Sequence, residues 1–310
     1  MVLRRPRTVH HRVEPVLGTR LDLHLGTTSD RRAGRALDAV LAEIDRLERI
    51  LSVFDPASEL ARWKRGELDR IGPELTAVLC DAAALMTATG GLFHPNLRTV
   101  TDRWKRAETE GIEPTAGELH ELLDDAAVLP YRCADGRIER TGPAIGLDLN
   151  AYAKGWIVDA AAGAAMRVDG IDSVVVNLGG EVAHRGHGGV VVAVEDPFRR
   201  AANAAPIAAC RISGQASATS GSSWRGFTIA GQRLGHVIDP RDGRPVGRIA
   251  SATVVAPTVA EADGWATVLA ILPPEEGLAA VAPRPAFVVD SERRTWSNPA
   301  WEAISAPPAP

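Results

Sequence analysis

One segment near the middle of the chain constrains its fold and chemistry more than any other. Residues 146–159 read GLDLNAYAKGWIVD, with an acid at Asp148, a run of small residues, and then Lys154 and Gly155 at a predicted strand-to-helix junction. Small residues at a helix N-terminus let backbone N–H groups approach a phosphate closely, and a nearby lysine adds positive charge. The frame of a P-loop is absent. The segment is thus suited to phosphate but does not by itself identify a ligand.

Strands and helices alternate on both sides of this junction. Alternating apolar residues predict a strand over 21–25, and an apolar stripe predicts the helix that follows, from Ser29 or Asp30 to Leu51. Further helices are predicted over about 73–89, 156–168 and 259–272, and residues 107–125 are predicted to be a polar surface helix or excursion. Further strands are predicted at 173–178, 190–194, 226–229, 252–255 and 286–289. This pattern predicts an α+β fold, a single mixed-sheet domain over residues 14–305 with helices packed on the sheet.

Composition and charge argue against several classes of protein. The chain has 310 residues, of which 45% are hydrophobic, and a net charge of −4, so there is no electrostatic reason to expect nucleic acid as a partner. No apolar run is long enough to span a membrane. Zinc-ligand spacings, a nucleophile elbow and a Rossmann glycine fingerprint are absent from the sequence.

The chain ends and the cysteines suggest a compartment. Residues 1–13 carry four arginines with no apolar run after them, which predicts a disordered basic tail and no signal peptide. The proline-rich residues 306–310 predict a second disordered tail. Cys80, Cys133 and Cys210 are odd in number and widely spaced, which argues against a disulfide framework. We therefore expect a cytoplasmic protein.

Asp263 and Thr267 form the first candidate constellation. They lie four residues apart on a predicted helix, so their oxygens share one face. A carboxylate with a hydroxyl suits a hard cation such as magnesium. The alternative is an acid favoured by the helix dipole and a threonine that bonds to the preceding turn.

His236 is the second candidate, at a predicted strand end before a Pro/Gly turn. Its ordinary pKa lies near neutrality, so it could act as a general base, although a lone histidine there is more often structural or exposed. Asp239 before Pro240 is equally well explained as a turn residue. Three more segments, 90–95, 177–181 and 218–223, combine glycines or hydroxyls in ways that fit either a ligand loop or a tight turn.

The order and spacing of these segments resemble the flavin transferases of the ApbE-like family, which move FMN from FAD onto a protein threonine or serine. The resemblance runs from about residue 17 to 287. Its strongest pieces are 148–159 (similar to the family's Asp-Leu-Gly-Gly-Ile-Ala-Lys-Gly-Tyr-x-x-Asp), 177–181, 218–221, 236–245 and 262–269. Five co-linear matches are far more specific than any one of them.

The resemblance implies a T-fold-like ApbE architecture, a flavin cleft and a magnesium-dependent reaction that releases AMP. It implies that FAD, as substrate, contacts Leu17, Leu92, Phe93, His94, Asp148, Lys154 and Val237. It implies Mg²⁺ ligands at Asp263, Thr267 and the backbone carbonyl of Ala151, with Ala266 close by. His236 would be the catalytic residue that activates the attacking hydroxyl. The implied partners are FAD and an acceptor protein with a target Ser/Thr.

Several residues depart from the family pattern. The family commonly has Gly-x-Phe-Asp-Pro-Thr where this chain has His94 and Asn96 in place of the acid and the hydroxyl. Lys64, Asn150, Tyr152 and Glu181 also differ from the usual residues. These changes concern nucleotide affinity and geometry more than the metal set. Three alternatives to transfer therefore stay open: FAD binding without transfer, FAD hydrolysis to FMN and AMP, and a catalytically empty relative.

Overall fold

A large antiparallel sheet organises the protein. The computed structural model describes residues 7–199, 204–221 and 226–307. Eight strands lie in the order β1-β2-β5-β6-β9-β12-β13-β14, and each neighbouring pair is antiparallel. Their bounds are β1 (Arg7–Val16), β2 (Thr19–Thr27), β5 (Ile171–Leu178), β6 (Glu181–Gly186), β9 (Ala216–Ser220), β12 (Ile249–Ala256), β13 (Ala286–Asp290) and β14 (Thr295–Ser297). The predicted α+β fold class, helices packed on a sheet, is confirmed.

The remaining elements are helices and three small hairpins. The helices are α1 (Asp30–Leu51), α2 (Glu59–Lys64), α3 (Pro73–Ala88), α4 (Arg98–Glu110), α5 (Ala116–Ala126), α6 (Asn150–Met166), α7 (Val259–Ile271), α8 (Pro274–Val281) and α9 (Pro299–Glu302). The hairpins are β3 (Tyr131–Ala134) with β4 (Arg137–Arg140), β7 (Val190–Val194) with β8 (Ala208–Ile212), and β10 (Gly226–Ile229) with β11 (Gln232–Gly235). Among these described helices none is both long and apolar enough to cross a membrane.

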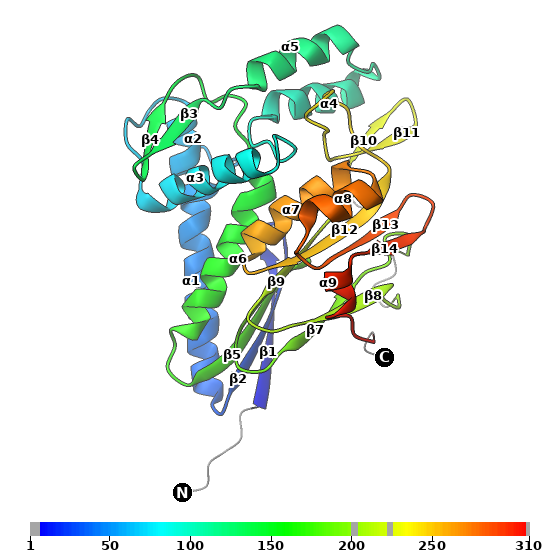
Figure 1. Ribbon diagram of the computed structural model, residues 1–310. Helices are drawn as coiled ribbons and strands as arrows, with labels where there is room; N and C mark the ends of the chain where they lie inside the picture. The colour runs from blue at the N-terminus through cyan, green and yellow to red at the C-terminus, as the bar shows by residue number, and fades with distance from the viewer. Residues whose placement is uncertain (1–6, 200–203, 222–225, 308–310) are drawn as a thin grey trace, which may run out of the picture.

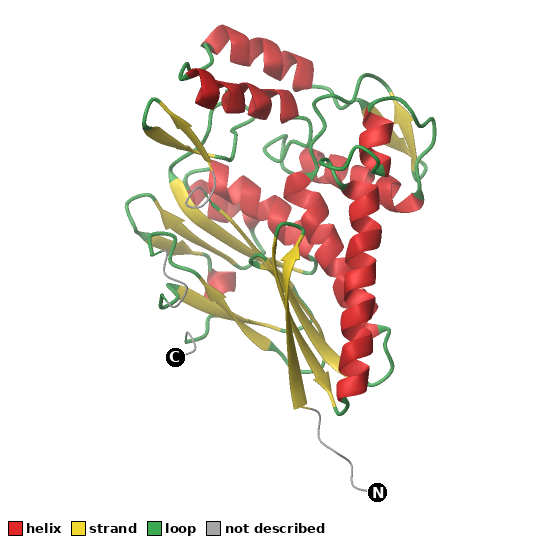
Figure 2. Ribbon diagram, turned by 180° about the vertical axis from the view of Figure 1, so that it is seen from behind, coloured by secondary structure: helices red, strands yellow, loops and turns green. Residues whose placement is uncertain are grey.

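The two faces of the sheet are covered differently. Helices α1, α6 and α7 pack on one face and bury the inward side chains of β2, which are Leu21, Leu23 and Leu25. The β7–β8 hairpin and α9 lie on the other side of the sheet, away from α1 (Figures 1 and 2). They form a second apolar cluster with Val182, Val255 and Phe287. The alternation of each strand thus separates a helix-covered face from a face that is only partly covered.

The prediction of a disordered tail over residues 1–13 is wrong for residues 7–13, which belong to β1. Val9 and Val13 pack against the main core, and on the opposite face Arg12 Nε donates to Asp22 Oδ1 at 2.8 Å. These contacts order a segment whose composition alone reads as polar. Residues 1–6 and 308–310 lie outside the described part of the chain, and in the predicted C-terminal tail Ala306 N donates to Ala209 O at 2.9 Å.

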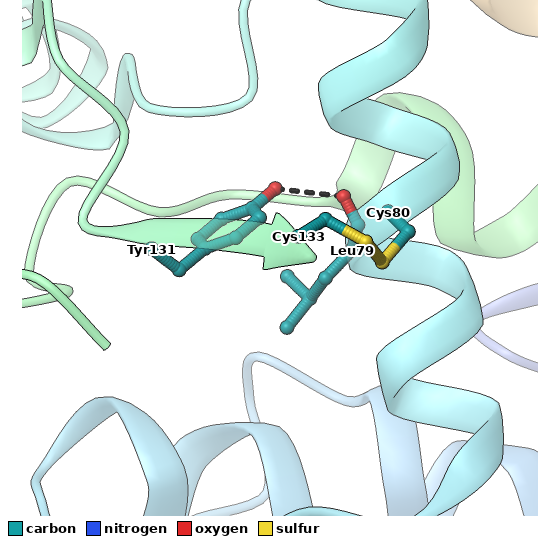
Figure 3. The surroundings of a disulfide bond; sticks show 4 residues. All are labelled: Leu79, Cys80, Tyr131 and Cys133. Carbon is teal, nitrogen blue, oxygen red and sulfur yellow. Dashed lines mark hydrogen bonds between the residues drawn. A yellow bond between two sulfur atoms is a disulfide. The ribbon is translucent and has the colours of Figure 1, made fainter. Parts of the chain in front are cut away.

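The argument against a disulfide is also wrong. Cys80 in α3 and Cys133 in β3 are bonded, with their Cα atoms 5.5 Å apart (Figure 3). Beside the disulfide, the Tyr131 hydroxyl donates to Leu79 O at 2.9 Å, so β3 is tied to α3 twice. Cys210 is buried with a free thiol. The three cysteines are thus one bonded pair and one buried core residue. Their spacing in the sequence does not show which two are bonded.

The predicted surface helix at 107–125 is two helices, α4 and α5. Gly111, with φ of 69°, ends α4, and a capping box of Thr115 and Glu118 begins α5. Their apolar faces pack together through Trp104 and Leu119. The other predicted helices and strands are confirmed to within a few residues, except that α6 begins at Asn150, six residues before the predicted start.

Candidate active site

Nine predicted site residues line one cleft of about 1500 Å³. They are Leu92, Phe93, His94, Asp148, Lys154, His236, Val237, Asp263 and Thr267. They come from the loop after α3, the start of α6, the segment after β11, and α7. Leu17, Ala151 and Ala266 are not among the residues that line the cleft.

The start of α7 is held by the same segment that carries Lys154. A methyl group at Gly155 would lie 2.7 Å from Ala260 N and 2.9 Å from Val259 C, so only glycine permits this approach of α6 to α7. One turn later, Asp159 Oδ2 accepts hydrogen bonds from Val259 N at 2.8 Å and Ala260 N at 3.2 Å. Two residues of the junction motif therefore fix the position of α7, and with it Asp263.

Asp159 is itself held by an ion pair. Arg185 of β6 donates to Asp159 Oδ1 at 2.7 Å. Burial raises the pKa of Asp159, while the two backbone N–H groups and Arg185 act in the opposite direction. The carboxylate thus satisfies the first turn of α7 and links α6 to the sheet.

Asp263 and Thr267 present two oxygen donors on one side of α7. Asp263 is 8% exposed, and Thr267 Oγ1 donates to Asp263 O at 3.1 Å, the back-bonding that was the alternative for this residue. Within the described ranges no group of three or more His, Cys, Asp or Glu side chains is placed to hold a metal. A site here would therefore need hydroxyl or backbone oxygens beside the carboxylate, and such hard donors fit Mg²⁺.

Gly264, next to Asp263, packs closely against the Leu85 side chain of α3. A methyl group at Gly264 would lie 2.1 Å from Leu85 Cδ2. Because α3 leads directly into residues 92–94, this contact brings Phe93 and His94 to the same cleft as Asp263. Ala266 on the same helix is fully buried, so it offers only backbone atoms.

Lys154 lies 2.7 Å from Glu181, Nζ to Oε1. Glu181 is 5% exposed and begins β6 after the tight turn at Gly179 and Gly180, where Gly180 N donates to Asn177 Oδ1 at 3.0 Å. Burial beside an acid orients the lysine ammonium at the cleft wall. The predicted segment 177–181 thus contributes through Glu181, one of the departures from the family pattern.

Asp148 is surrounded by basic and backbone groups. Its Oδ1 accepts from Asn150 N at 2.9 Å, and Arg98 of α4 lies 3.8 Å from its Oδ2. Lys64 of α2 donates to the backbone oxygen of Leu147, and burial lowers the pKa of this lysine. Lys64, one of the departures from the family pattern, therefore supports the junction from outside the cleft. Asn150, another departure, is the first residue of α6.

His94 and Asn96 have clear structural roles. Asn96 N donates to His94 Nδ1 at 3.3 Å, and burial lowers the pKa of His94, so the imidazole is neutral with its proton on Nε2. Asn96 Nδ2 donates to Ala126 O at 3.1 Å. A methyl group at Gly146 would lie 2.7 Å from Asn96 Oδ1. These two departures connect the loop of residues 92–96 to the junction.

His236 enters the cleft from the segment after β11, beside Val237. Val246 N donates to Val237 O at 2.9 Å, and the turn is fixed to α4 because Trp104 Nε1 donates to Gly243 O at 2.7 Å. Asp239 accepts hydrogen bonds from the Arg241 backbone and side chain, which supports its reading as a turn residue.

The outer face of β2 is a part of the cleft that the sequence reasoning missed. Arg20, Asp22 and His24 line it, and Asp22 accepts from Arg20 Nε at 2.7 Å. The alternation that identified the strand also placed these three on the face opposite the leucines, so the signal was present. Leu17 lies in the β1–β2 turn with φ of 47°, next to Gly18, which does line the cleft.

Two further predicted parts of the site lie at the start of α6 and at the end of β9. Ala151 belongs to the first turn of α6, and its carbonyl as a metal ligand stays a prediction. Residues 218–220 of the segment interpreted as a loop or tight turn instead end strand β9; Ser220 and Gly221 line the cleft, whereas Ser222 and Ser223 lie outside the described residues.

The sequence is similar to those of known proteins. The chain is 33% identical over 305 residues to the FAD:protein FMN transferase of Escherichia coli, covering 88% of this chain and 83% of that protein. It is 30% identical over 271 residues to the FAD:protein FMN transferase of Rhodobacter capsulatus, covering 84% of this chain but only about half, 51%, of that protein.

A solved structure shares the fold. The crystal structure of the ApbE protein of Thermotoga maritima superposes with a TM-score of 0.83 at 21% identity, over 97% of this chain and 100% of that one. The family model described as ApbE family matches residues 17–288, a range that contains every residue of the cleft predicted above. The chain therefore belongs to the ApbE family.

Proposed function

We propose that this protein transfers the FMN moiety of FAD to a serine or threonine hydroxyl of an acceptor protein and releases AMP, with Mg²⁺ required. The relatives named FAD:protein FMN transferase support flavin transfer to a protein. The observation that carries the proposal is that Asp148, Lys154, His236 and Asp263, from distant parts of the chain, line one cleft. Residues 14–305 would act as one catalytic domain, since the eight-stranded sheet joins both ends of that range.

The proposed step is a displacement at the FMN-side phosphorus. The acceptor oxygen forms a bond to that phosphorus, the bond to the bridging pyrophosphate oxygen breaks, and AMP leaves with that oxygen. His236 accepts the hydroxyl proton as the oxygen attacks. Lys154, oriented by Glu181, faces the pyrophosphate as a point charge.

Asp263 and Thr267, with the backbone carbonyl of Ala151, would hold the metal. A bound magnesium ion would neutralise the pyrophosphate charge. Asp263 lines the cleft at 8% exposure, so its carboxylate is a hard oxygen donor at the cleft wall, of the kind that Mg²⁺ prefers.

The compartment predicted from the sequence stays a prediction. The cysteines no longer support a cytoplasmic location, because Cys80 and Cys133 form a disulfide and disulfides persist mainly in oxidising environments.

A pair of isosteric variants on α7 tests the metal assignment. Asp263→Asn removes a charge inside the cleft, whereas Glu261→Gln removes one that pairs with Arg284 at 2.7 Å and is not among the cleft residues. We expect Asp263→Asn to abolish Mg²⁺-dependent AMP release and calorimetric Mg²⁺ binding to the FAD complex. Glu261→Gln should keep both. Equal behaviour of the two variants would exclude Asp263 as a ligand.

The products separate transfer from its alternatives. FMN on the acceptor together with free AMP supports the proposal. Free FMN and AMP with an unlabelled acceptor would identify a pyrophosphatase, and tight FAD binding without turnover would identify a carrier.

A further inference from the structure

One edge of strand β7 runs along the cleft. Every residue from 187 to 195 lines the same cleft as Asp148 and Asp263. Successive side chains of a strand point to opposite faces, so a cleft that touches each residue in turn must follow the main chain along one edge. Among the described strands β7 pairs with β8 alone, which leaves this edge open.

The pairing of β8 shows which groups lie at the open edge. On the side of β8 away from β7, Arg211 N donates to Ile304 O at 2.8 Å and Ala209 O accepts from Ala306 N at 2.9 Å. Their partners in β7 are Val191 and Ala193. Because backbone groups alternate in direction along an antiparallel strand, the N–H and C=O groups of Val191 and Ala193 point away from β8. They form a row of donors and acceptors facing the cleft.

The side chains of β7 suit an added strand. Val190, Val192 and Val194 pack in the second apolar cluster on the outer face of the sheet, which also includes Val175 and Val182, so the backbone is held in place. No charged residue or proline interrupts Val190–Val194. The open edge of β1, in contrast, carries arginines, histidines and Pro15, which are residues that block edge pairing.

We propose that the free edge of β7 binds an extended segment of the acceptor protein as an additional strand. This inference rests on the proposed function, which requires a polypeptide in the cleft. Strand addition uses main-chain hydrogen bonds for affinity, and the outer face of β5 and β2, with Val175, Asn177 and His24 lining the cleft, would lie beneath the added segment. Because this edge lines the same cleft as Asp148 and Asp263, a segment bound to it would bring the acceptor hydroxyl towards FAD.

Hydrogen exchange on the full-length protein tests the proposal directly. The probe is a protein acceptor of the Escherichia coli relative, with its target hydroxyl residue changed to alanine so that the complex does not turn over. We expect the amides of Val191 and Ala193 to exchange at least about tenfold more slowly when the probe is bound, since each gains a hydrogen bond. The amides of Val190 and Val192, already bonded to β8, should not change. Unchanged exchange at Val191 and Ala193 would overturn the proposal.

Ala193→Pro provides the kinetic test, with Ala193→Val as its matched control. Proline removes an N–H from the open edge without removing a bond to β8, and such positions tolerate proline. We expect Ala193→Pro to lower kcat/KM for the unmodified acceptor about tenfold with unchanged FAD affinity, and Ala193→Val, which keeps this N–H, to lower it less. Val191→Pro gives a second, independent variant.

The outcomes separate a failure of the proposed function from a failure of the strand-addition site. If the wild type labels no acceptor, the proposed function fails and this inference fails with it. If the wild type labels the acceptor and both proline variants do so equally well, only the strand-addition site is wrong. Dimerisation through β7, seen as protection of Val191 and Ala193 without the probe, would likewise replace the acceptor with a second copy.

Discussion

Replacing Gly155 with alanine measures how strongly the site depends on the contact between α6 and α7. The added methyl group would lie 2.7 Å from Ala260 N, 2.8 Å from Ala260 Cα and 2.9 Å from Val259 C. All three are backbone atoms of the first turn of α7, so no side chain can rotate away. The two helices must separate, and Asp263 must move relative to Asp148 and Lys154.

Gly163→Ala is the matched control on the same helix. A methyl group there would meet only Arg167 Nη1, at 3.5 Å, which is an ordinary contact. Alanine favours a helix over glycine by about 1 kcal/mol, and both variants gain this amount. Overpacking costs about 1–3 kcal/mol. The free energies of unfolding should therefore differ by about 1–3 kcal/mol, with Gly163→Ala the more stable.

Urea unfolding followed by circular dichroism gives the stability difference, and AMP release with FAD and acceptor gives the activity. Displacing catalytic groups by about 1 Å can lower a rate about 100-fold. We expect Gly155→Ala to lose activity well beyond its loss of stability and Gly163→Ala to keep wild-type activity. If both variants gain stability equally and remain fully active, the proposed role of Gly155 is refuted.

Three further predictions address other parts of the account. Asp159→Ala should destabilise the protein by about 2–4 kcal/mol in urea unfolding, because it removes the oxygen that accepts two hydrogen bonds from the start of α7 and leaves Arg185 without this partner; a loss below about 0.5 kcal/mol would contradict the capping role. Burial lowers the pKa of His94 in the folded protein below its value in the unfolded chain. As the pH falls, the unfolded chain therefore takes up this proton before the folded protein does, and the free energy of unfolding decreases below about pH 6.5. His94→Gln should therefore lose less stability than the wild type between pH 8 and pH 5.5, and parallel losses would refute this assignment. Cys133→Ser should lower the free energy of unfolding by about 2–4 kcal/mol, and dithiothreitol should reduce the wild type to the same value; a wild type unaffected by reductant under denaturing conditions would contradict the disulfide.

Local pattern predicted the helices α1, α3, α6 and α7 and four of the eight strands of the sheet, β2, β5, β12 and β13. The apolar stripe of α1 and the short apolar run of β7 identified those elements because periodicity depends on neighbouring residues alone. β1 was missed because His10, His11 and Arg12 interrupt its apolar alternation, and its order comes from pairing with β2. The Cys80–Cys133 bond was missed for a similar reason, since 53 residues separate the two cysteines.

The candidate site, too, was predictable where it depends on local residue types and not where it depends on contacts between distant segments. Residue types and their order indicated the junction, His236 and the Asp263–Thr267 pair, and the structure brings them to one cleft. The sequence could not reveal why the junction needs Gly155 and Asp159, because their partners Val259 and Ala260 lie about 100 residues away. It also gave no sign that Asn96 bonds to Ala126, or that Lys64 supports Leu147.

The central claim is that FMN is transferred from FAD to a side chain of the acceptor protein. The intact mass of the acceptor tests this claim most directly. After incubation of this protein with FAD, Mg²⁺ and an acceptor of the Escherichia coli relative, we predict that the acceptor gains the mass of one FMN less one water. One AMP should be released for each acceptor labelled, and changing the target hydroxyl residue to alanine should prevent the gain. An acceptor of unchanged mass beside free FMN and AMP would contradict the account.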